Sequence, residues 1–299
     1  MKEIVKDIYY IKPNLKVAFD SFKYLIDSKS DDGLIIIDPG IYIDFVRGVE
    51  EAGYNPKDIK HCLITHAHLD HYGACHELQK YNNNIEFYAH ELDAQHIEQK
   101  YDLESIEEFW PGYDYNPVSI SRRIKNNEIL KFGQLKIRCI HTPGHSQGAV
   151  TYSTKIDGSK IIFAGDIGGW TLKIYGSEYN DYMNSMQRLK DLKMDILCDG
   201  HQGVIQPAKR ASLYIQGFME FNKNLHIAIE EDPSNVKAWY NLALQSYDMC
   251  DYDFALDFCN YLLEKNPKYN DAKQLLDKIK KHNPCRIDYI KTIVKRYSK

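Results

Sequence analysis

The sequence has no long apolar run and no paired-cysteine motif. Its 299 residues contain no stretch of transmembrane length, and the start, Met1-Lys2-Glu3-Ile4, lacks the apolar core of a signal peptide. The seven cysteines are scattered without a Cys-x-x-Cys pair, which disfavours a disulfide framework. The formal net charge of −4 gives no general attraction for a polyanion. We therefore expect a cytoplasmic protein that binds neither a membrane nor nucleic acid.

One short stretch concentrates residues that bind metals. Residues 65–73 read Thr-His-Ala-His-Leu-Asp-His-Tyr-Gly and directly follow an apolar run, a pattern that predicts a buried strand ending in a loop. Alternate residues of an extended chain point the same way, so His66 and His68 can bind one ion together, while Asp70 and His71 face a second. Imidazole with carboxylate suits zinc, iron or manganese.

The same pattern recurs along the chain. Three further apolar runs end close to a residue that binds metals, namely His145, Asp166 and His201. Two β-rich halves, each with helices after it, predict a four-layer α/β/β/α sandwich with the site along one shared edge. Thr65 and Asp38 also lie near strand ends and are candidate hydrogen-bond partners for ligand N–H groups. For Asp38, loop capping is the favoured interpretation.

Helical periodicity and a long irregular segment complete the first part of the chain. Helices are predicted over residues 43–52, 72–81, 91–100 and 180–192. Residues 101–127 are aromatic and irregular, with Trp110, Tyr113 and Tyr115 around Pro111-Gly112. Such a segment is either a substrate loop or a surface loop held by its aromatic side chains.

Beyond residue 205 the pattern changes to helices alone. A long helix is expected over 208–231, and two helices over 236–269 resemble one tetratricopeptide repeat. The residues that carry this resemblance are Trp239, Leu242, Ala243, Ala255, Leu256 and Pro267. We therefore expect a small all-α, repeat-like region over 206–299.

The earlier part of the chain, residues 1–205, resembles the metallo-β-lactamase-fold superfamily, in its glyoxalase II-like branch. Four motifs in the family's order carry the resemblance: His-x-His-x-Asp-His at 66–71, Thr-Pro-Gly-His at 142–145, Phe-Ala-Gly-Asp at 163–166 and Gly-His at 200–201. This implies a catalytic domain with the metallo-β-lactamase sandwich. Residues that bind glutathione in glyoxalase II have no clear match, so that substrate is not carried over.

The resemblance also implies a complete ligand set for two divalent metal ions. The residues that would bind them are His66, His68 and His145 for one ion, Asp70, His71 and His201 for the other, and Asp166 for the bridge between them. Zinc is the expected metal, with iron or manganese as alternatives. Bound ions lower the pKa of water from about 15.7 toward about 7, which supplies a metal-bridging hydroxide. Asp70 would orient that hydroxide and is the candidate catalytic residue.

Together these features predict a dinuclear metal-dependent hydrolase of an ester, thioester, lactone or amide bond in a small metabolite. One alternative is a mononuclear iron oxygenase that resembles the persulfide dioxygenases, although the complete ligand set argues against it. Another is an interaction protein that uses the repeat region. One repeat is short for a peptide groove, so packing on the catalytic domain or self-association is favoured over binding a protein partner.

Overall fold

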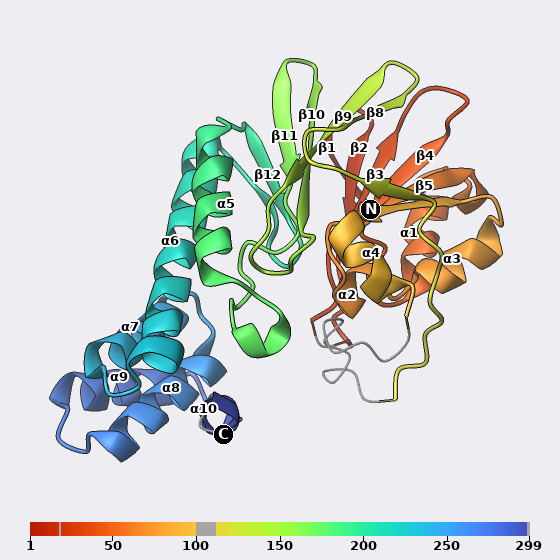
Figure 1. Cartoon of the computed structure of the whole chain (residues 1–299). Helices are drawn as coiled ribbons and strands as arrows, with labels where there is room; N and C mark the ends of the chain where they lie inside the picture. The colour runs from red at the N-terminus through yellow and green to blue at the C-terminus, as the bar shows by residue number, and fades with distance from the viewer. Residues whose placement is uncertain (18, 100–111, 298–299) are drawn as a thin grey trace. The chain divides into compact units, whose positions relative to one another are not determined.

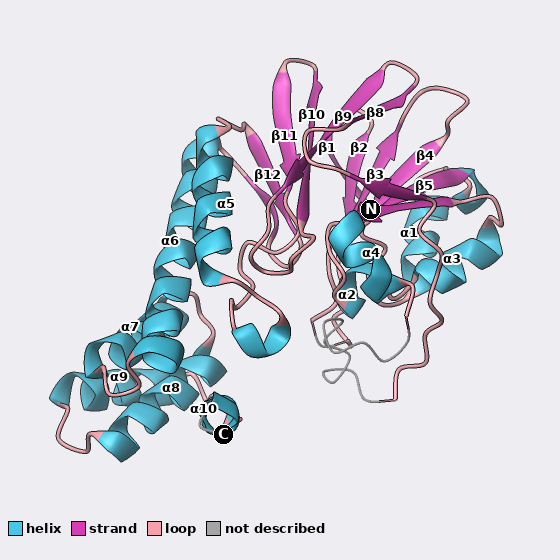
Figure 2. Cartoon of the chain, viewed as in Figure 1, coloured by secondary structure: helices cyan, strands magenta, loops and turns pink. Residues whose placement is uncertain are grey.

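The computed structural model describes residues 1–299 except 18, 100–111 and 298–299. The chain forms two compact units. The first contains Met1–Gly169 and Tyr175–Ile215, and the second contains Trp170–Ile174 and Gln216–Lys299. Figures 1 and 2 show that both sheets belong to the first unit and that the second unit is built from helices.

The described residues of the first unit form a seven-stranded and a six-stranded sheet. The first sheet has the order β1 (Lys2–Val5), β2 (Ile8–Ile11), β3 (Lys23–Asp27), β4 (Leu34–Ile37), β5 (Ile59–Leu63), β6 (Glu86–His90) and β7 (Arg122–Ile124). The second has the order β13 (Gly203–Ile205), β12 (Ile196–Asp199), β11 (Ser159–Phe163), β10 (Val150–Ile156), β9 (Leu135–His141) and β8 (Ile129–Phe132).

Strand directions bring several carboxyl ends to common edges. Strands β4 to β7 pair in parallel, as do β11 and β12. Strand β10 is antiparallel to both β9 and β11, so β9, β11 and β12 share one direction. Parallel strands end at the same edge of a sheet, and loops at that edge are the usual place for a site in an open α/β sheet.

Strand β4 illustrates how the sandwich packs. All four of its residues are buried, because one face of the strand meets helices and the other meets the second sheet. Leu34 and Ile36 belong to the core under the helices, whereas Ile35 and Ile37 belong to the core between the sheets. A continuous apolar run is the expected sequence for a strand covered on both faces. The predicted sandwich, followed by helices, is confirmed.

The helices of the first unit cover the outer faces of its sheets (Figure 2). In the first unit they are α1 (Val46–Glu51), α2 (Leu69–Tyr72), α3 (Cys75–Tyr81), α4 (Glu91–Ile97) and α5 (Tyr179–Asp191). Helix α6 (Ala208–His226) begins in the first unit and continues in the second, followed by a π-helical turn, Ile227–Glu231. The second unit also holds α7 (Val236–Asp248), α8 (Tyr252–Lys265), α9 (Asn270–Lys280) and α10 (Tyr289–Tyr297).

Two details differ from the sequence prediction. The helix expected over 72–81 is split, because the Ala74 N–H donates to the Gly40 carbonyl 2.9 Å away instead of continuing a helix. The segment expected to be irregular contains strand β7, which was missed because it is only three residues long and two of them are exposed arginines. Trp110 and Pro111 lie outside the described residues.

The second unit has an aromatic core that includes a segment from the middle of the chain. The Trp170 ring lies 4.9–6.0 Å, between centroids, from four aromatic rings of α6, α8 and α10, which are Phe221, Phe254, Phe258 and Tyr289. The backbone N–H and the hydroxyl of Thr171 both donate to Asn222 Oδ1 at 2.9 Å. Residues 170–174 are therefore part of the helical unit, although they lie between β11 and α5 in the chain. Whether α7 and α8 form a tetratricopeptide repeat stays a prediction.

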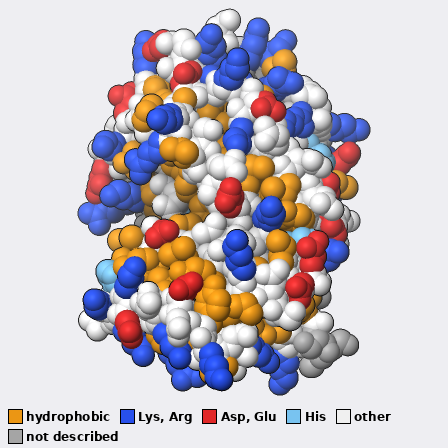
Figure 3. Space-filling view, turned by 90° about the vertical axis from the view of Figure 1, so that its left-hand side faces the viewer, with side chains coloured by type: hydrophobic (Ala, Val, Ile, Leu, Met, Phe, Trp, Pro, Cys, Tyr) orange, Lys and Arg blue, Asp and Glu red, His pale blue; other side chains and the backbone are white. Residues whose placement is uncertain are grey.

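On the face drawn in Figure 3, basic and acidic side chains are interspersed among polar and apolar ones. Among the described residues, no helix has the length and apolar character needed to cross a membrane. All seven cysteines are free thiols, five of them buried. A cytoplasmic location stays a prediction.

Candidate metal centre

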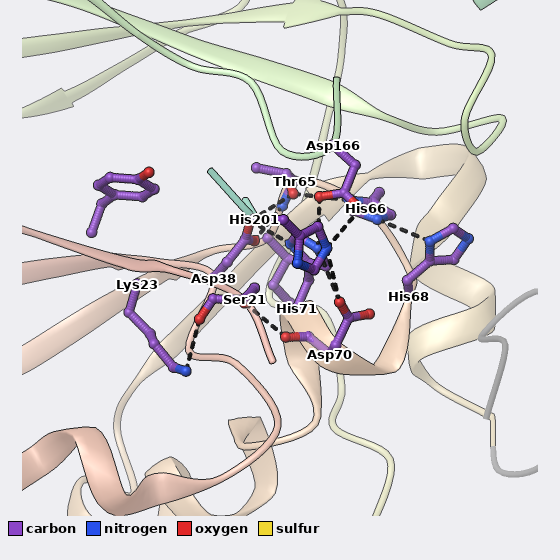
Figure 4. A network of polar contacts seen from close by, with 12 residues as sticks. Ser21, Lys23, Asp38, Thr65, His66, His68, Asp70, His71, Asp166 and His201 are labelled. Carbon is purple, nitrogen blue, oxygen red and sulfur yellow. Dashed lines mark hydrogen bonds and ion pairs between the residues drawn. The ribbon is translucent and has the colours of Figure 1, made fainter. Parts of the chain in front are cut away.

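The structure brings all seven candidate metal-binding residues into one cluster, of which Figure 4 labels all except His145. They form three overlapping groups, in each of which the possible ligand atoms lie within 4.8 Å of one another. The groups are His66, His68 and His145; His66, His71 and Asp166; and Asp70, His71 and His201. The first and third match the two halves expected from sequence, and the second connects them.

Each residue lies in a loop or first helical turn after a strand. His66 and His68 follow β5, His66 in a bend and His68 as the extended N-cap of α2, so Asp70 and His71 fall within that helix. The backbone of α2 is held by the Ser21 hydroxyl, which donates to the Asp70 carbonyl at 2.7 Å. His145, Asp166 and His201 follow β9, β11 and β12 respectively.

Hydrogen bonds between the two sheets hold these loops at a common edge. The Val150 N–H, at the start of β10, donates to the Thr65 carbonyl at 2.8 Å. The Tyr152 hydroxyl donates to the Ile64 carbonyl at 2.8 Å, and the Tyr24 hydroxyl donates to the Asp199 carbonyl at 2.7 Å. The loop after β5 is thereby fixed to the second sheet beside the loops that carry the other candidate ligands.

Asp166 lies between the two halves of the cluster. Its Oδ1 is 3.0 Å from His71 Nε2, and its Oδ2 is 3.0 Å from His201 Nε2 and 3.5 Å from His145 Nε2. Burial raises the pKa of this carboxyl, but the imidazoles of His201 and His71 more than offset burial and hold the pKa well below its usual value. An ionised carboxylate that faces both halves has the position required of a bridge.

The imidazoles differ in their electrostatic surroundings. Burial lowers the pKa of His66 and His68 well below the usual value, and neighbouring imidazoles lower it further, so these rings stay neutral. Neutral imidazole is the form that binds metal. Burial also lowers the pKa of His71 and His201, but Asp166 and Asp70 outweigh it and raise the pKa well above its usual value.

Asp38 and Thr65 contact the imidazoles from behind. The Thr65 hydroxyl donates to Asp38 Oδ2 at 2.7 Å and accepts from His66 Nδ1 at 3.0 Å, while His71 Nδ1 lies 2.9 Å from the same Asp38 oxygen. These contacts leave the Nε2 atoms of both rings to face the cluster. Asp38 makes both kinds of contact considered from the sequence: its Oδ1 accepts the Thr65 N–H at 2.8 Å, as loop capping requires, and its Oδ2 lies beside a candidate ligand.

The unsatisfied atoms of the cluster fit a metal site. Within the described residues, several buried side-chain atoms make no hydrogen bond of acceptable geometry, although some of them are paired as ions with Asp166: His68 Nε2, His71 Nε2, both ring nitrogens of His145 and Asp166 Oδ1. A buried polar atom without a partner costs about 1–3 kcal/mol, so several in one place call for an explanation. Divalent ions coordinated by these lone pairs would satisfy most of them, and the donor set of imidazole and carboxylate suits zinc, iron or manganese.

Sequence reasoning missed two buried carboxylates next to the cluster. Asp93, in α4, accepts from the loops that carry His66, His68 and His145, and Asp199 accepts from the backbone of Ile167 at 3.1 Å and of His201 at 2.9 Å. Asp93 has no sequence signal, since its partners follow other strands, whereas Asp199 contacts the loop after its own strand at His201 and the loop after β11 at Ile167. His141, in contrast, stacks on His90 with centroids 4.0 Å apart and belongs to none of the three groups.

Comparison with known proteins identifies the family. The chain belongs to the metallo-β-lactamase superfamily, whose sequence profile matches residues 19–201. A hydroxyacylglutathione hydrolase from Buchnera aphidicola is 25% identical over 196 residues, which cover 64% of this chain and 66% of the relative. A hydroxyacylglutathione hydrolase, GloC, from Haemophilus influenzae is 30% identical over 141 residues, which cover 44% of this chain and 59% of the relative. The match thus spans less than two thirds of the length of each of these relatives.

Solved structures share the fold. BJP-1, a subclass B3 metallo-β-lactamase of Bradyrhizobium japonicum, superposes with a TM-score of 0.61 at 24% identity, over 75% of this chain and 92% of the other. The class B3 di-zinc metallo-β-lactamase LRA-12, from an Alaskan soil metagenome, gives a TM-score of 0.59 at 22% identity, over 74% and 90%. At these sequence identities the similarity establishes the fold but does not indicate which substrate this chain binds.

Proposed function

We propose that this chain is a two-metal hydrolase that cleaves an ester, thioester, lactone or amide bond in a small metabolite. The observation that carries the proposal is the pair of three-residue groups, His66, His68 and His145 on one side and Asp70, His71 and His201 on the other, with Asp166 between them. Two divalent ions held there would lower the pKa of a water from about 15.7 toward about 7 and supply hydroxide at neutral pH.

The chain's own residues would orient the reactants. The Asp70 carboxylate lies 3.5 Å from His71 Nε2 and 3.3 Å from His201 Nε2, so it faces the same space as the candidate ligands. An oxygen of Asp70 is placed to accept a hydrogen bond from the attacking water and to hold its lone pair toward the substrate carbonyl. Asp38 would keep His71 in the required tautomer.

Thioesters are the first substrates to test. The relatives named above are hydroxyacylglutathione hydrolases, and a hydroxyacylglutathione is a thioester. Their alignment with this chain is partial, and the chain lacks a clear match to the family's glutathione-binding residues, so the thiol part of the substrate stays open. A panel of thioesters, lactones, esters and amides therefore tests the reaction class, and phosphoesters serve as the contrasting class.

Metal content is the decisive measurement for this proposal. We expect about two divalent ions per chain in protein purified without chelators, measured by element-resolved mass spectrometry. Removal of the ions by a chelator should abolish turnover, and their return should restore it. A single iron per chain with oxygen uptake would instead support the oxygenase alternative. No bound metal after reconstitution would refute both.

A substitution at Gly200 tests whether metal binding requires the observed close packing of Asp166 and His71 against this residue. A Cβ at position 200 would lie 2.4 Å from Asp166 Oδ1 and 2.6 Å from His71 Cε1, so Gly200→Ala must displace a candidate ligand. We expect a loss of metal affinity of about 10- to 100-fold, measured by competition with a chromophoric chelator. Gly217→Ala is the matched control, because a Cβ there meets nothing within 4 Å. Equal affinities in the two variants would contradict the arrangement.

A further inference from the structure

One buried carboxylate joins the two loops that supply the three-histidine group. Asp93 lies in the first turn of α4 and is 1% exposed. Its Oδ2 accepts from the Ala67 N–H at 2.8 Å and from the Ser146 hydroxyl at 2.7 Å, and its Oδ1 accepts from the Gly148 N–H at 2.6 Å. Ala67 separates His66 from His68, and Ser146 follows His145.

The packing around Asp93 leaves little freedom. A Cβ at position 148 would lie 2.4 Å from Asp93 Oδ1 and 2.5 Å from the Asp93 backbone nitrogen, so only glycine allows this close approach. Both carboxylate oxygens are used by donors from the loops. Charge-assisted hydrogen bonds of this kind are short and directional, so they fix the distance between the groups that they join.

We propose that Asp93 is a positioning residue that sets the distance between His145 and the pair His66 and His68. The two loops follow strands β5 and β9, which belong to different sheets. A metal site requires its ligands to be held to within a few tenths of an ångström, and the residues behind the ligands supply that precision. Asp93 acts through two backbone N–H groups and one hydroxyl, and it contacts none of the candidate ligand atoms.

The other half of the cluster has separate supports. Asp38 contacts His71, and Asp199 accepts from the backbone of Ile167 and His201. Among the described residues, the hydrogen bonds of Asp93 go to Ala67, Ser146 and Gly148, and none goes to a residue of α2 or to the loops of Asp166 and His201. Its loss is therefore expected to weaken one half of the site selectively, which a general loss of stability would not do.

This inference rests on the proposed function, since it requires that the cluster bind ions. The test uses the full chain, stripped of metal and titrated with Co²⁺, whose absorption reports its coordination. The background His201→Ala retains the three-histidine group, and the background His68→Ala retains the Asp70, His71 and His201 group. Asp93→Asn keeps the size of the side chain but removes the negative charge, and it is made in both backgrounds.

We expect Asp93→Asn to weaken Co²⁺ binding about 10- to 100-fold in the His201→Ala background and by less than about 2-fold in the His68→Ala background. Asp199→Asn should show the opposite preference. Equal losses in both backgrounds, or no loss in either, would overturn the positioning role. If the wild-type chain binds no ion at all, the proposed function is refuted, and the positioning role of Asp93 is refuted together with it.

Two further variants separate positioning from folding. Asp257→Asn removes a comparably buried carboxylate, 3% exposed, which accepts the Ile290 N–H at 2.8 Å in the helical unit. It should lower the melting temperature and leave both Co²⁺ affinities unchanged. Ser146→Ala removes only one of the three hydrogen-bond donors to Asp93, so this variant should fold even if Asp93→Asn does not. It should lower the Co²⁺ affinity of the three-histidine group, but by less than Asp93→Asn does. An unchanged affinity in Ser146→Ala, with Asp93→Asn unfolded, would count against the proposal.

Discussion

Replacing Asp166 with Ala is expected to lower turnover by about 10³-fold or more and to reduce the metal content below one ion per chain. Among the described residues, Asp166 is the one carboxylate with ion-pair distances of 3.5 Å or less to imidazoles from both halves of the cluster. Its removal takes away a negative charge and leaves His71, His201 and His145 without a common partner. Two divalent ions held by neutral imidazoles would then repel each other without a carboxylate charge to offset the repulsion. Metal content and turnover on the best substrate of the panel measure the effect.

The control for this variant is Asp195→Ala. Asp195 is an exposed carboxylate beside β12, and its Oδ2 accepts the Lys160 N–H at 2.8 Å, far from any candidate ligand. It should leave metal content and turnover unchanged. Asp166→Asn is a second variant that keeps the side-chain volume and removes the charge. Its metal content and turnover should be as low as those of Asp166→Ala. If Asp166→Asn retained two ions and full turnover, the bridging role would be wrong.

The candidate ligands could be predicted because their signal is local. His66, His68, Asp70 and His71 lie within six positions, and the other three each follow an apolar run that reads as a strand. Loops after parallel strands meet at one edge, so the fold class alone predicts that such residues converge. Their proximity in the structure agrees with that reasoning, and their binding of metal is the prediction that the experiments test.

The supports behind the ligands could not be predicted, because their partners are distant in sequence. Asp93 accepts from donors that lie 26, 53 and 55 residues away. In the sequence Glu-Leu-Asp-Ala it is one more acidic residue in the first turn of a helix, where acidic residues are common for reasons of the helix dipole. Only the fold shows that this side chain is buried and turned toward the loops. For Asp38 the sequence left two interpretations open, and it could not show the contact with His71, because that contact spans 33 residues.

The helical region is expected to be needed for the solubility of the chain. A chain that ends at Ile215 should be recovered in the insoluble fraction, because it removes the partners of residues 170–174. Trp170 would lose its four aromatic neighbours, and Leu172, which is 0% exposed, would be uncovered. Within the full chain, Leu172→Ala should lower the free energy of unfolding of the helical unit by about 2–5 kcal/mol. Solubility and thermal melting measure the two effects.

Rescue of the shortened chain distinguishes a structural role from a partner-binding role. If exposed apolar side chains cause the aggregation, replacing Trp170 and Leu172 by Ser in the chain that ends at Ile215 should restore much of the soluble yield. If the unmodified short chain is instead soluble and as active as the full one, the helices form a separable module whose purpose is to bind a partner. The first outcome is favoured because residues 170–174 belong to the helical unit and would lose their buried contacts in the shortened chain.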